Sequence, residues 1–131
     1  MLAGSTIGRG ETMPKVLGIG GVFFRAADPV ALAEWYRQHL GIADLHHEVW
    51  QQEAGTTIFG PFAQNSGYFG RPAQQWMINF RVDDLDAFIT ALTAAGLEVE
   101  TRAEWNSEVG RFARIHDPEG NPIELWQPAK G

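Results

Sequence analysis

The fold of this chain is decided by the stretch His116-Asp117-Pro118-Glu119-Gly120-Asn121-Pro122-Ile123-Glu124-Leu125-Trp126. Asp117–Pro118 is typical of the start of a turn, because proline presets φ and the Asp side chain can accept hydrogen bonds from the backbone ahead of it. Gly120–Asn121 tolerates positive φ and closes the turn. We therefore predict a tight turn that leads directly into a strand.

The strand after this turn has two different faces. Side chains alternate along a strand, so Ile123 and Leu125 share one face, while Glu124 and Trp126 share the other. The aliphatic face predicts a core covered by helices. Glu124 therefore points away from that core, where a carboxylate is costly to desolvate unless something pairs with it. The partner of Glu124 is the main functional question that the sequence raises.

Two helices are predicted upstream, each with a start signal, an apolar stripe and a terminating glycine. Asp28–Pro29 opens the first helix as N-cap and first helical residue, and Gly41 ends it. Asp83–Asp84 caps the second helix, and Gly96 ends that one. The stripes at helical spacing are Leu32, Trp35, Tyr36 and Leu40 in the first helix, and Leu85, Phe88, Ile89, Leu92 and Ala95 in the second.

Strands are predicted around these helices, and their order repeats. They cover residues 17–25, 44–50, 55–59, 76–82, 97–101 and 111–116. Residues 60–72 suit either a long loop or an irregular strand pair, and residues 102–110 form a loop. The motif Phe-Arg-x-x-Asp occurs at 24–28 and again at 80–84, each time between a strand and a helix. We expect an α+β fold in which two βαβββ modules form curved sheets around a shared cleft.

The domain prediction follows from this repeat. Residues 15–131 form one domain, with module one at about 16–72 and module two at about 76–128, and residues 1–14 form a flexible tail. The tail leaves open whether Met1 or Met13 is the natural start.

Composition excludes several classes of function. A net charge of −6 and a pI near 5.1 argue against nucleic acid and anionic membranes as partners. No apolar run approaches membrane-spanning length. The apolar content of 44% is typical of a globular protein. The absence of cysteine excludes thiolate chemistry and fits a reducing cytoplasm.

The order of these motifs resembles the glyoxalase, bleomycin-resistance and extradiol-dioxygenase superfamily, the vicinal oxygen chelate proteins. The resemblance extends from about residue 16 to 128 and is carried by 28–36 (Asp-Pro-Val-Ala-Leu-Ala-Glu-Trp-Tyr), 79–85 (Asn-Phe-Arg-Val-Asp-Asp-Leu) and above all 117–125. It implies paired βαβββ modules and a cleft for a small molecule. It also implies a homodimer, which is common among members with one module pair per chain.

Metal-using members of that superfamily hold a divalent ion through one side chain on each of four strands. By resemblance, Glu124 takes the last position, whereas Gly21 and Met77 fall at two others, and the fourth lies within 60–72, which contains no Glu or His. A single carboxylate holds a hard divalent ion poorly. We therefore expect an incomplete metal site and no cofactor.

The predicted cleft is aromatic and basic with one acid. Alternation along the strands brings in the substrate-binding candidates Phe23, Arg25, Asn79, Arg81, Phe112, Arg114 and Trp126, with Glu124 and His116 as catalytic candidates. Arginine forks hold carboxylates and aromatic walls bury flat bodies. This lining suits a small anionic or aromatic ligand.

Each assignment has a structural alternative. Glu124 can simply pair with an inner-face arginine. Arg25 and Arg81 precede helix caps and can be solvated there, and His116 can cap its turn. His39, His46 and His47 suit surface positions better than metal ligation. The aromatic residues Phe62, Tyr68 and Phe69 suit either a lid over the pocket or a dimer interface.

Two functional classes remain open from the sequence. In the first, the protein is a metal-free binding module that sequesters or senses its ligand. In the second, it is a glyoxalase-like lyase or isomerase, or a dioxygenase-type enzyme, with an atypical metal site or with acid–base chemistry. In the acid–base case Glu124 is the general base and His116 the proton donor, or the reverse.

Overall fold

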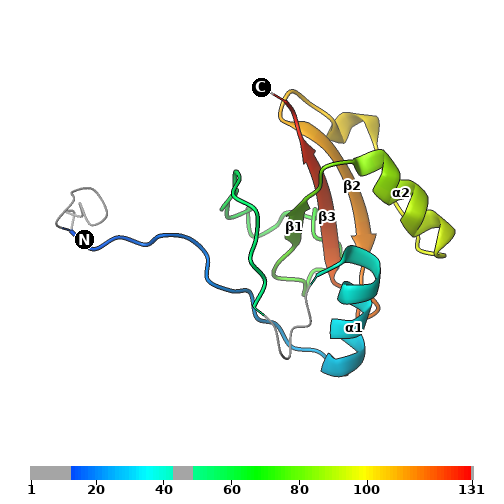
Figure 1. Cartoon of the computed structure of the whole chain (residues 1–131), viewed down its shortest axis with the longest axis horizontal. Helices are drawn as coiled ribbons and strands as arrows, with labels where there is room; N and C mark the ends of the chain where they lie inside the picture. The colour runs from blue at the N-terminus through cyan, green and yellow to red at the C-terminus, as the bar shows by residue number, and fades with distance from the viewer. Residues whose placement is uncertain (1–12, 43–48, 131) are drawn as a thin grey trace.

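The computed structural model of the chain describes residues 13–42 and 49–130 (Figure 1). The elements are α1 (Pro29–Leu40), β1 (Ile78–Arg81), α2 (Leu85–Ala94), the 3₁₀ turn η1 (Ala103–Trp105), β2 (Gly110–His116) and β3 (Pro122–Pro128). The sheet has the order β1-β3-β2, with β1 parallel and β2 antiparallel to β3. The predicted mixed α+β class, with a curved open sheet and two helices, is confirmed.

Both helices begin and end where the sequence predicted. Asp28 accepts a hydrogen bond from the backbone N–H of Ala31, and Asp84 accepts one from Ala87. Gly41 adopts a left-handed conformation with φ of +70°, which glycine reaches without steric cost. These local signals fix the helix ends because capping depends only on residues a few positions apart.

The turn between β2 and β3 is built around the buried side chain of Asp117. Its carboxylate accepts hydrogen bonds from the backbone N–H groups of Glu119 (2.9 Å) and Asn121 (3.0 Å), and from the Asn121 side chain (2.8 Å). Gly120 has φ of +84°, as the sequence suggested for one of the two turn residues. One carboxylate therefore accepts three hydrogen bonds within the turn.

The aliphatic face of the sheet forms the core, as predicted from alternation. Ala113, Ile115, Ile123 and Leu125 are fully buried there. Helices α1 and α2 both cover this face and lie on the same side of the sheet in Figure 1. The helix residues that complete the buried cluster are Leu32, Tyr36, Leu85 and Leu92. Glu124 consequently lies on the opposite, helix-free face.

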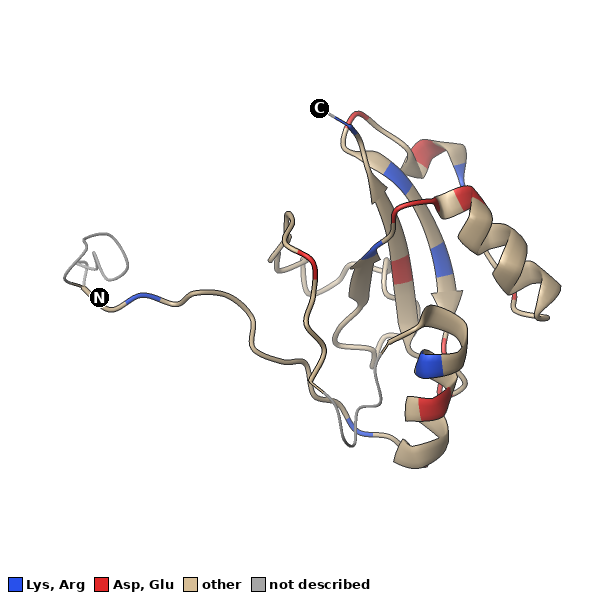
Figure 2. Ribbon diagram, viewed as in Figure 1, with Lys and Arg blue, Asp and Glu red and all other residues tan. Residues whose placement is uncertain are grey.

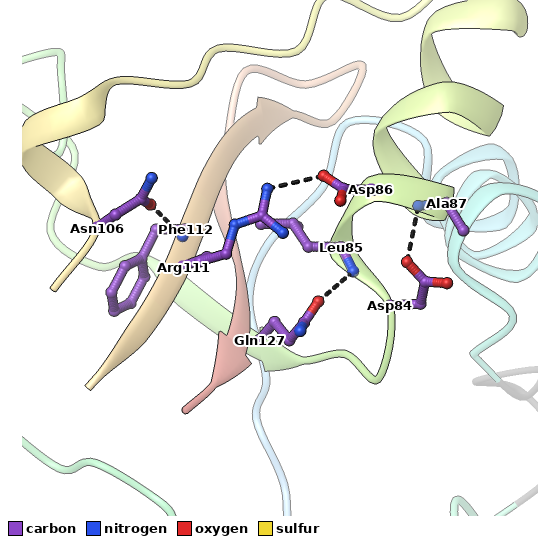
Figure 3. Close-up of polar contacts among 8 residues, drawn as sticks. All are labelled: Asp84, Leu85, Asp86, Ala87, Asn106, Arg111, Phe112 and Gln127. Atoms are coloured by element: carbon purple, nitrogen blue, oxygen red, sulfur yellow. Dashed lines mark hydrogen bonds and ion pairs between the residues drawn. The ribbon is translucent and has the colours of Figure 1, made fainter. Parts of the chain in front are cut away.

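The start of α2 is fixed to the sheet by side chains from the last two strands (Figure 3). Gln127 accepts a hydrogen bond from the backbone N–H of Leu85 at 2.7 Å, which satisfies one of the free donors at a helix start. Arg111 forms an exposed ion pair with Asp86 at 2.7 Å. In the same view Phe112 and Arg111 leave β2 on opposite sides, as neighbouring strand residues must.

Helix α1 and the two residues before it are attached to the turn between β2 and β3 by three hydrogen bonds. The Glu119 carboxylate accepts hydrogen bonds from the backbone N–H groups of Ala27 (2.7 Å) and Asp28 (2.9 Å). The buried Tyr36 hydroxyl donates to Asp117 at 2.7 Å. All three hydrogen bonds join residues distant in sequence, so they connect the first half of the chain to the last strands.

The strands predicted for the first module were wrong within the described residues. Residues 17–25 and 55–59 are extended but form no strand, and the prediction at 44–50 lies largely outside the described part. Phe23 is 94% exposed and Leu17 89%. Extended backbone becomes a strand only when a neighbour supplies hydrogen bonds, which apolar alternation does not guarantee. The pairing of two modules therefore stays a prediction.

The short strand predicted at 97–101 was also wrong in extent. It is reduced to one isolated bridge, in which Glu100 and Arg114 exchange backbone hydrogen bonds at 2.9 and 2.8 Å. The loop that follows it contains the single 3₁₀ turn η1. This loop brings Trp105 towards the helix-free face, which matters for the site.

Candidate functional site

Glu124 is the centre of the helix-free face. It is the one charged residue of β3, and its Cα is paired with that of Arg114 on β2 (Figure 2). The side chain of Asn79 on β1 donates a hydrogen bond to Glu124 Oε1 at 2.8 Å, and the Tyr68 hydroxyl donates to Oε2 at 2.5 Å. Both carboxylate oxygens therefore have a neutral donor.

An aromatic pocket of about 270 Å³ opens beside this carboxylate. Its lining consists of four rings and the acid, namely Phe62, Tyr68, Trp105, Phe112 and Glu124. The Phe62 and Tyr68 rings stack with centroids 5.6 Å apart, and the Tyr68 and Trp105 rings meet edge to face at 6.2 Å. The volume lies just below the usual range for ligand pockets, ~300–1,000 Å³.

Arg114 lies next to this pocket and is almost completely buried, with 7% exposure. Its guanidinium carbon is 4.6 Å from the centre of the Tyr68 ring and 5.6 Å from that of Trp105. No ion pair within 4.0 Å joins it to Glu124, so the alternative in which this acid pairs with an inner-face arginine does not describe these two residues. Arg114 Nε and Nη2 are buried without a hydrogen-bond partner among the described residues.

Tyr68 is held in its neutral form by its surroundings. Burial of the hydroxyl, followed by its hydrogen bond to Glu124 and the charge of that carboxylate, raises the pKa of Tyr68 to about 12. Arg114 acts in the opposite direction and lowers the pKa less than these causes raise it. At neutral pH the pocket therefore presents a protonated phenol to its one acid.

Phe112 and Trp126 form the floor beside the pocket. Their rings are parallel, with an interplanar angle of 2° and centroids 6.0 Å apart. The indole N–H of Trp126 donates to the backbone carbonyl of Val109 at 2.9 Å, which fixes the ring. Phe112 lines the pocket, whereas Trp126 is 6% exposed and is not one of the lining residues.

Four of the predicted site residues lie elsewhere. Phe23 and Arg25 line a second, more open hollow of about 590 Å³, formed with residues 73–76. Arg81 donates to the backbone carbonyl of Glu53 at 3.0 Å. His116 is exposed at the end of β2, and its side chain forms no hydrogen bond with another described residue. The structure therefore brings together Asn79, Phe112, Arg114, Glu124 and Trp126 out of the predicted set.

Three residues of the pocket were not among the predicted site residues. Phe62 and Tyr68 were expected only as parts of a lid or interface cluster, and Trp105 was not singled out at all. All three lie outside regular strands, in regions where alternation gives no direction for a side chain. A tryptophan in a loop that directly precedes a cleft-lining strand is the signal that could have found Trp105.

The residues present do not fit the divalent ion that metal-using superfamily members hold. Within residues 13–42 and 49–130, no group of three or more His, Asp or Glu side chains lies close enough to hold a metal. Both oxygens of Glu124 are engaged by Tyr68 and Asn79. Glycine and methionine at 21 and 77 supply no hard donor. No step of the chemistry below depends on a metal. His46 and His47 lie outside the described residues.

Comparison with known families decides the classification. The glyoxalase-like domain family matches residues 21–126, which include both helices and nearly all of the sheet. The chain belongs to the glyoxalase-like domain family. No curated protein matches the chain.

Two solved structures are similar to this glyoxalase-like domain. The crystal structure of TnmS3, an antibiotic-binding protein from Streptomyces sp. CB03234, is similar with a TM-score of 0.52 and 25% sequence identity over 79% of this chain and 88% of that chain. A glyoxalase/bleomycin resistance protein from the same strain shares 35% identity over 43% of this chain and 48% of that chain, with a TM-score of 0.36. In the described part of the glyoxalase-like domain, no helix is long and apolar enough to cross a membrane.

Proposed function

We propose that this glyoxalase-like domain binds a small aromatic compound in the pocket beside Glu124, and that it sequesters or senses that compound. The observation that carries the proposal is the ring of Phe62, Tyr68, Trp105 and Phe112 around one carboxylate. Aromatic walls with a few fixed polar groups are typical of small-molecule sites. The hydrogen bonds to both oxygens of Glu124 favour a holding role for this acid over proton transfer.

An antibiotic is the ligand class that the similarity to TnmS3 supports, since that protein is an antibiotic-binding protein. The size of the pocket restricts the choice. A volume of about 270 Å³ suits one ring or a small fused ring system, and a larger compound would have to extend into solvent. An aromatic moiety of a larger antibiotic therefore fits the proposal as well as a small free compound does.

A thermal-shift and titration screen of small aromatic compounds tests this function. A ligand that binds only the folded state stabilises it by about 2.7 kcal/mol at a hundred times its Kd. Phe112→Ala removes a pocket wall and should weaken binding at least tenfold, whereas Phe59→Ala, at a ring that is 88% exposed and away from the pocket, should leave it unchanged. If no aromatic compound stabilises the protein, the proposed function is wrong.

One observation favours catalysis as a second candidate. The Tyr68 hydroxyl lies 2.5 Å from Glu124, so a proton donor and an acceptor are already in contact. In this alternative Tyr68 replaces His116 as the donor, because His116 makes no contact with the acid. Turnover of a bound compound that is lost in Glu124→Gln, while binding persists, would support the lyase or isomerase class.

We infer in addition that the protein acts as a homodimer in the cytoplasm. Large apolar side chains are exposed on the two extended segments of the first module, among them Leu17, Phe23 and Phe59. Exposed extended apolar segments are typical of surfaces that pair with another chain. Light scattering should give twice the 14.5 kDa of the chain, and Leu17→Asp with Phe23→Asp should give a monomer. The absence of cysteine suits the cytoplasm.

A further inference from the structure

Arg114 has two hydrogen-bond donors that nothing in the described chain uses. Nε and Nη2 form one edge of the guanidinium plane, on which two N–H bonds run parallel. A buried charged donor without an acceptor is costly, and few proteins retain such a group without a reason. The residues over this guanidinium, Tyr68 and Trp105, are also walls of the pocket. Arg114 is not itself a lining residue of the pocket, but it adjoins the pocket through these two shared rings.

We propose that Arg114 is the receptor for a carboxylate carried by the aromatic ligand, held by its Nε–Nη2 edge while the ring lies among Phe62, Trp105 and Phe112. This inference rests on the proposed function and specifies its ligand class as an aromatic monocarboxylic acid. Two parallel N–H donors match the two oxygens of a carboxylate in one plane. The ring then occupies the apolar part of the pocket.

The local charges favour a monoanion over a dianion. Arg114 supplies one positive charge, and its cross-strand neighbour Glu124 supplies one negative charge on the same face. A carboxylate neutralises the guanidinium, whereas a phosphate brings a further charge close to Glu124 without a second buried cation to balance it. Phosphorylated ligands are therefore expected to bind worse than carboxylates, although both fit the arginine edge.

Access to the edge requires a side chain to move, because both nitrogens are enclosed. Tyr68 lies over the guanidinium, and its hydroxyl interacts with both Glu124 and Arg114. It belongs to a segment without helix or strand, where a side chain can change position at low cost. Carboxylate binding therefore displaces the Tyr68 ring and breaks its bond to Glu124.

Calorimetric titration with matched ligands tests the proposal on the unmodified protein. Benzoate and 2-naphthoate should bind roughly ten- to a hundredfold more tightly than benzamide and 2-naphthamide, which have similar shapes but no charge. Arg114→Gln should abolish this preference. Arg102→Gln is the matched control, since Arg102 also lies over Trp105 at 5.5 Å but is exposed and paired with Glu100, and it should retain the preference.

A second variant tests displacement of the tyrosine. Tyr68→Phe keeps the ring and removes the bond to Glu124, so benzoate should bind about three- to tenfold more tightly. In the unmodified protein, saturating benzoate should shift the titration of Tyr68 towards the ordinary tyrosine pKa. Weaker benzoate binding in Tyr68→Phe would overturn the displacement.

The outcomes separate this inference from the proposed function. Equal binding of acids and amides would overturn the role of Arg114 while leaving an aromatic-binding protein. Tighter binding of inorganic phosphate than of benzoate would overturn the monocarboxylate assignment. If Arg114→Gln unfolds the protein, the comparison of acid with amide still decides the question. Failure of all aromatic compounds to bind would remove the proposed function itself.

Discussion

Tyr68 donates a hydrogen bond of 2.5 Å to Glu124 across 56 residues of sequence. This contact closes the loop at 60–72 over the helix-free face of the sheet. It also gives the single acid of β3 a neutral partner, where the sequence had suggested either an arginine or a metal. The predictions that follow start from this contact and move outward to the turn and the sheet.

The folded protein should resist ionisation of its tyrosines. Burial and contact with a carboxylate raise the pKa of Tyr68 to about 12 and raise that of Tyr36 further, and these are the two tyrosines of the chain. Unfolded tyrosine ionises near pH ~10. Phenolate absorbance should therefore be absent at pH 10 in the native protein and half-developed at that pH in denaturant. Native phenolate at pH 10 would contradict the buried contacts.

The same raised pKa values set the alkaline limit of stability. Because the folded state favours the protonated phenol, their contribution is fully present below pH ~10 and is lost as the pH rises towards the folded-state pKa of Tyr68, about 12. Urea midpoints should fall over this range in the unmodified protein. In Tyr68→Phe the urea midpoint should fall less steeply with rising pH. An equally steep fall would mean that other groups cause the loss of stability at alkaline pH.

Removal of the Asp117 carboxylate should destabilise the protein strongly. Asp117→Ala leaves the Tyr36 hydroxyl and two turn N–H groups without their acceptor in a buried place. We expect a loss of ~2–4 kcal/mol in the free energy of unfolding, measured by urea denaturation. Asp83→Ala, at an exposed residue next to the cap of α2, is the control and should leave the midpoint unchanged.

Gly110 at the start of β2 should tolerate no side chain. It has φ of +137°, and an added Cβ would lie 2.4 Å from the backbone oxygen of Gln127 and 2.6 Å from Trp126 Nε1. Gly110→Ala should cost ~2–4 kcal/mol in the free energy of unfolding, through strain and overlap with the neighbouring strand. Gly67→Ala, where an added Cβ meets no atom within 4 Å, should change stability by less than ~0.5 kcal/mol.

Glu119 should be needed to hold the start of α1. Glu119→Ala removes the acceptor of the Ala27 and Asp28 N–H groups, and we expect a loss of ~1–2 kcal/mol in the free energy of unfolding. Amide hydrogen exchange should accelerate in the first turn of α1 more than in α2. Glu108→Ala, at an exposed carboxylate in the loop before β2, should leave the exchange pattern intact.

The parts of the fold that the sequence predicted well depend on neighbours along the chain. The caps at Asp28 and Asp84, the turn at Asp117 and the two faces of β3 all follow from residues a few positions apart. The strands at 17–25 and 55–59 were predicted from apolar content, but strand formation depends on a distant partner that local pattern does not specify.

The candidate site likewise contains residues that local sequence predicted and residues that it did not. Asn79, Phe112 and Arg114 were predicted because alternation gives every strand residue a face. Phe62, Tyr68 and Trp105 complete the pocket from segments outside the strands, whose side-chain directions follow from tertiary contacts alone. The sequence also could not predict that Nε and Nη2 of Arg114 lack acceptors, because this depends on the tertiary positions of all surrounding acceptor groups.

The attachment of α1 to the turn between β2 and β3 also bears on how the chain folds during synthesis. Helix α1 is synthesised early, but the acceptors of Tyr36 and of the Ala27 N–H group belong to Asp117 and Glu119. The helix therefore emerges from the ribosome long before its anchors exist, and its apolar stripe stays uncovered in the meantime. Slow translation between α2 and β2 would lengthen that interval and extend the time for which the uncovered stripe of α1 can aggregate.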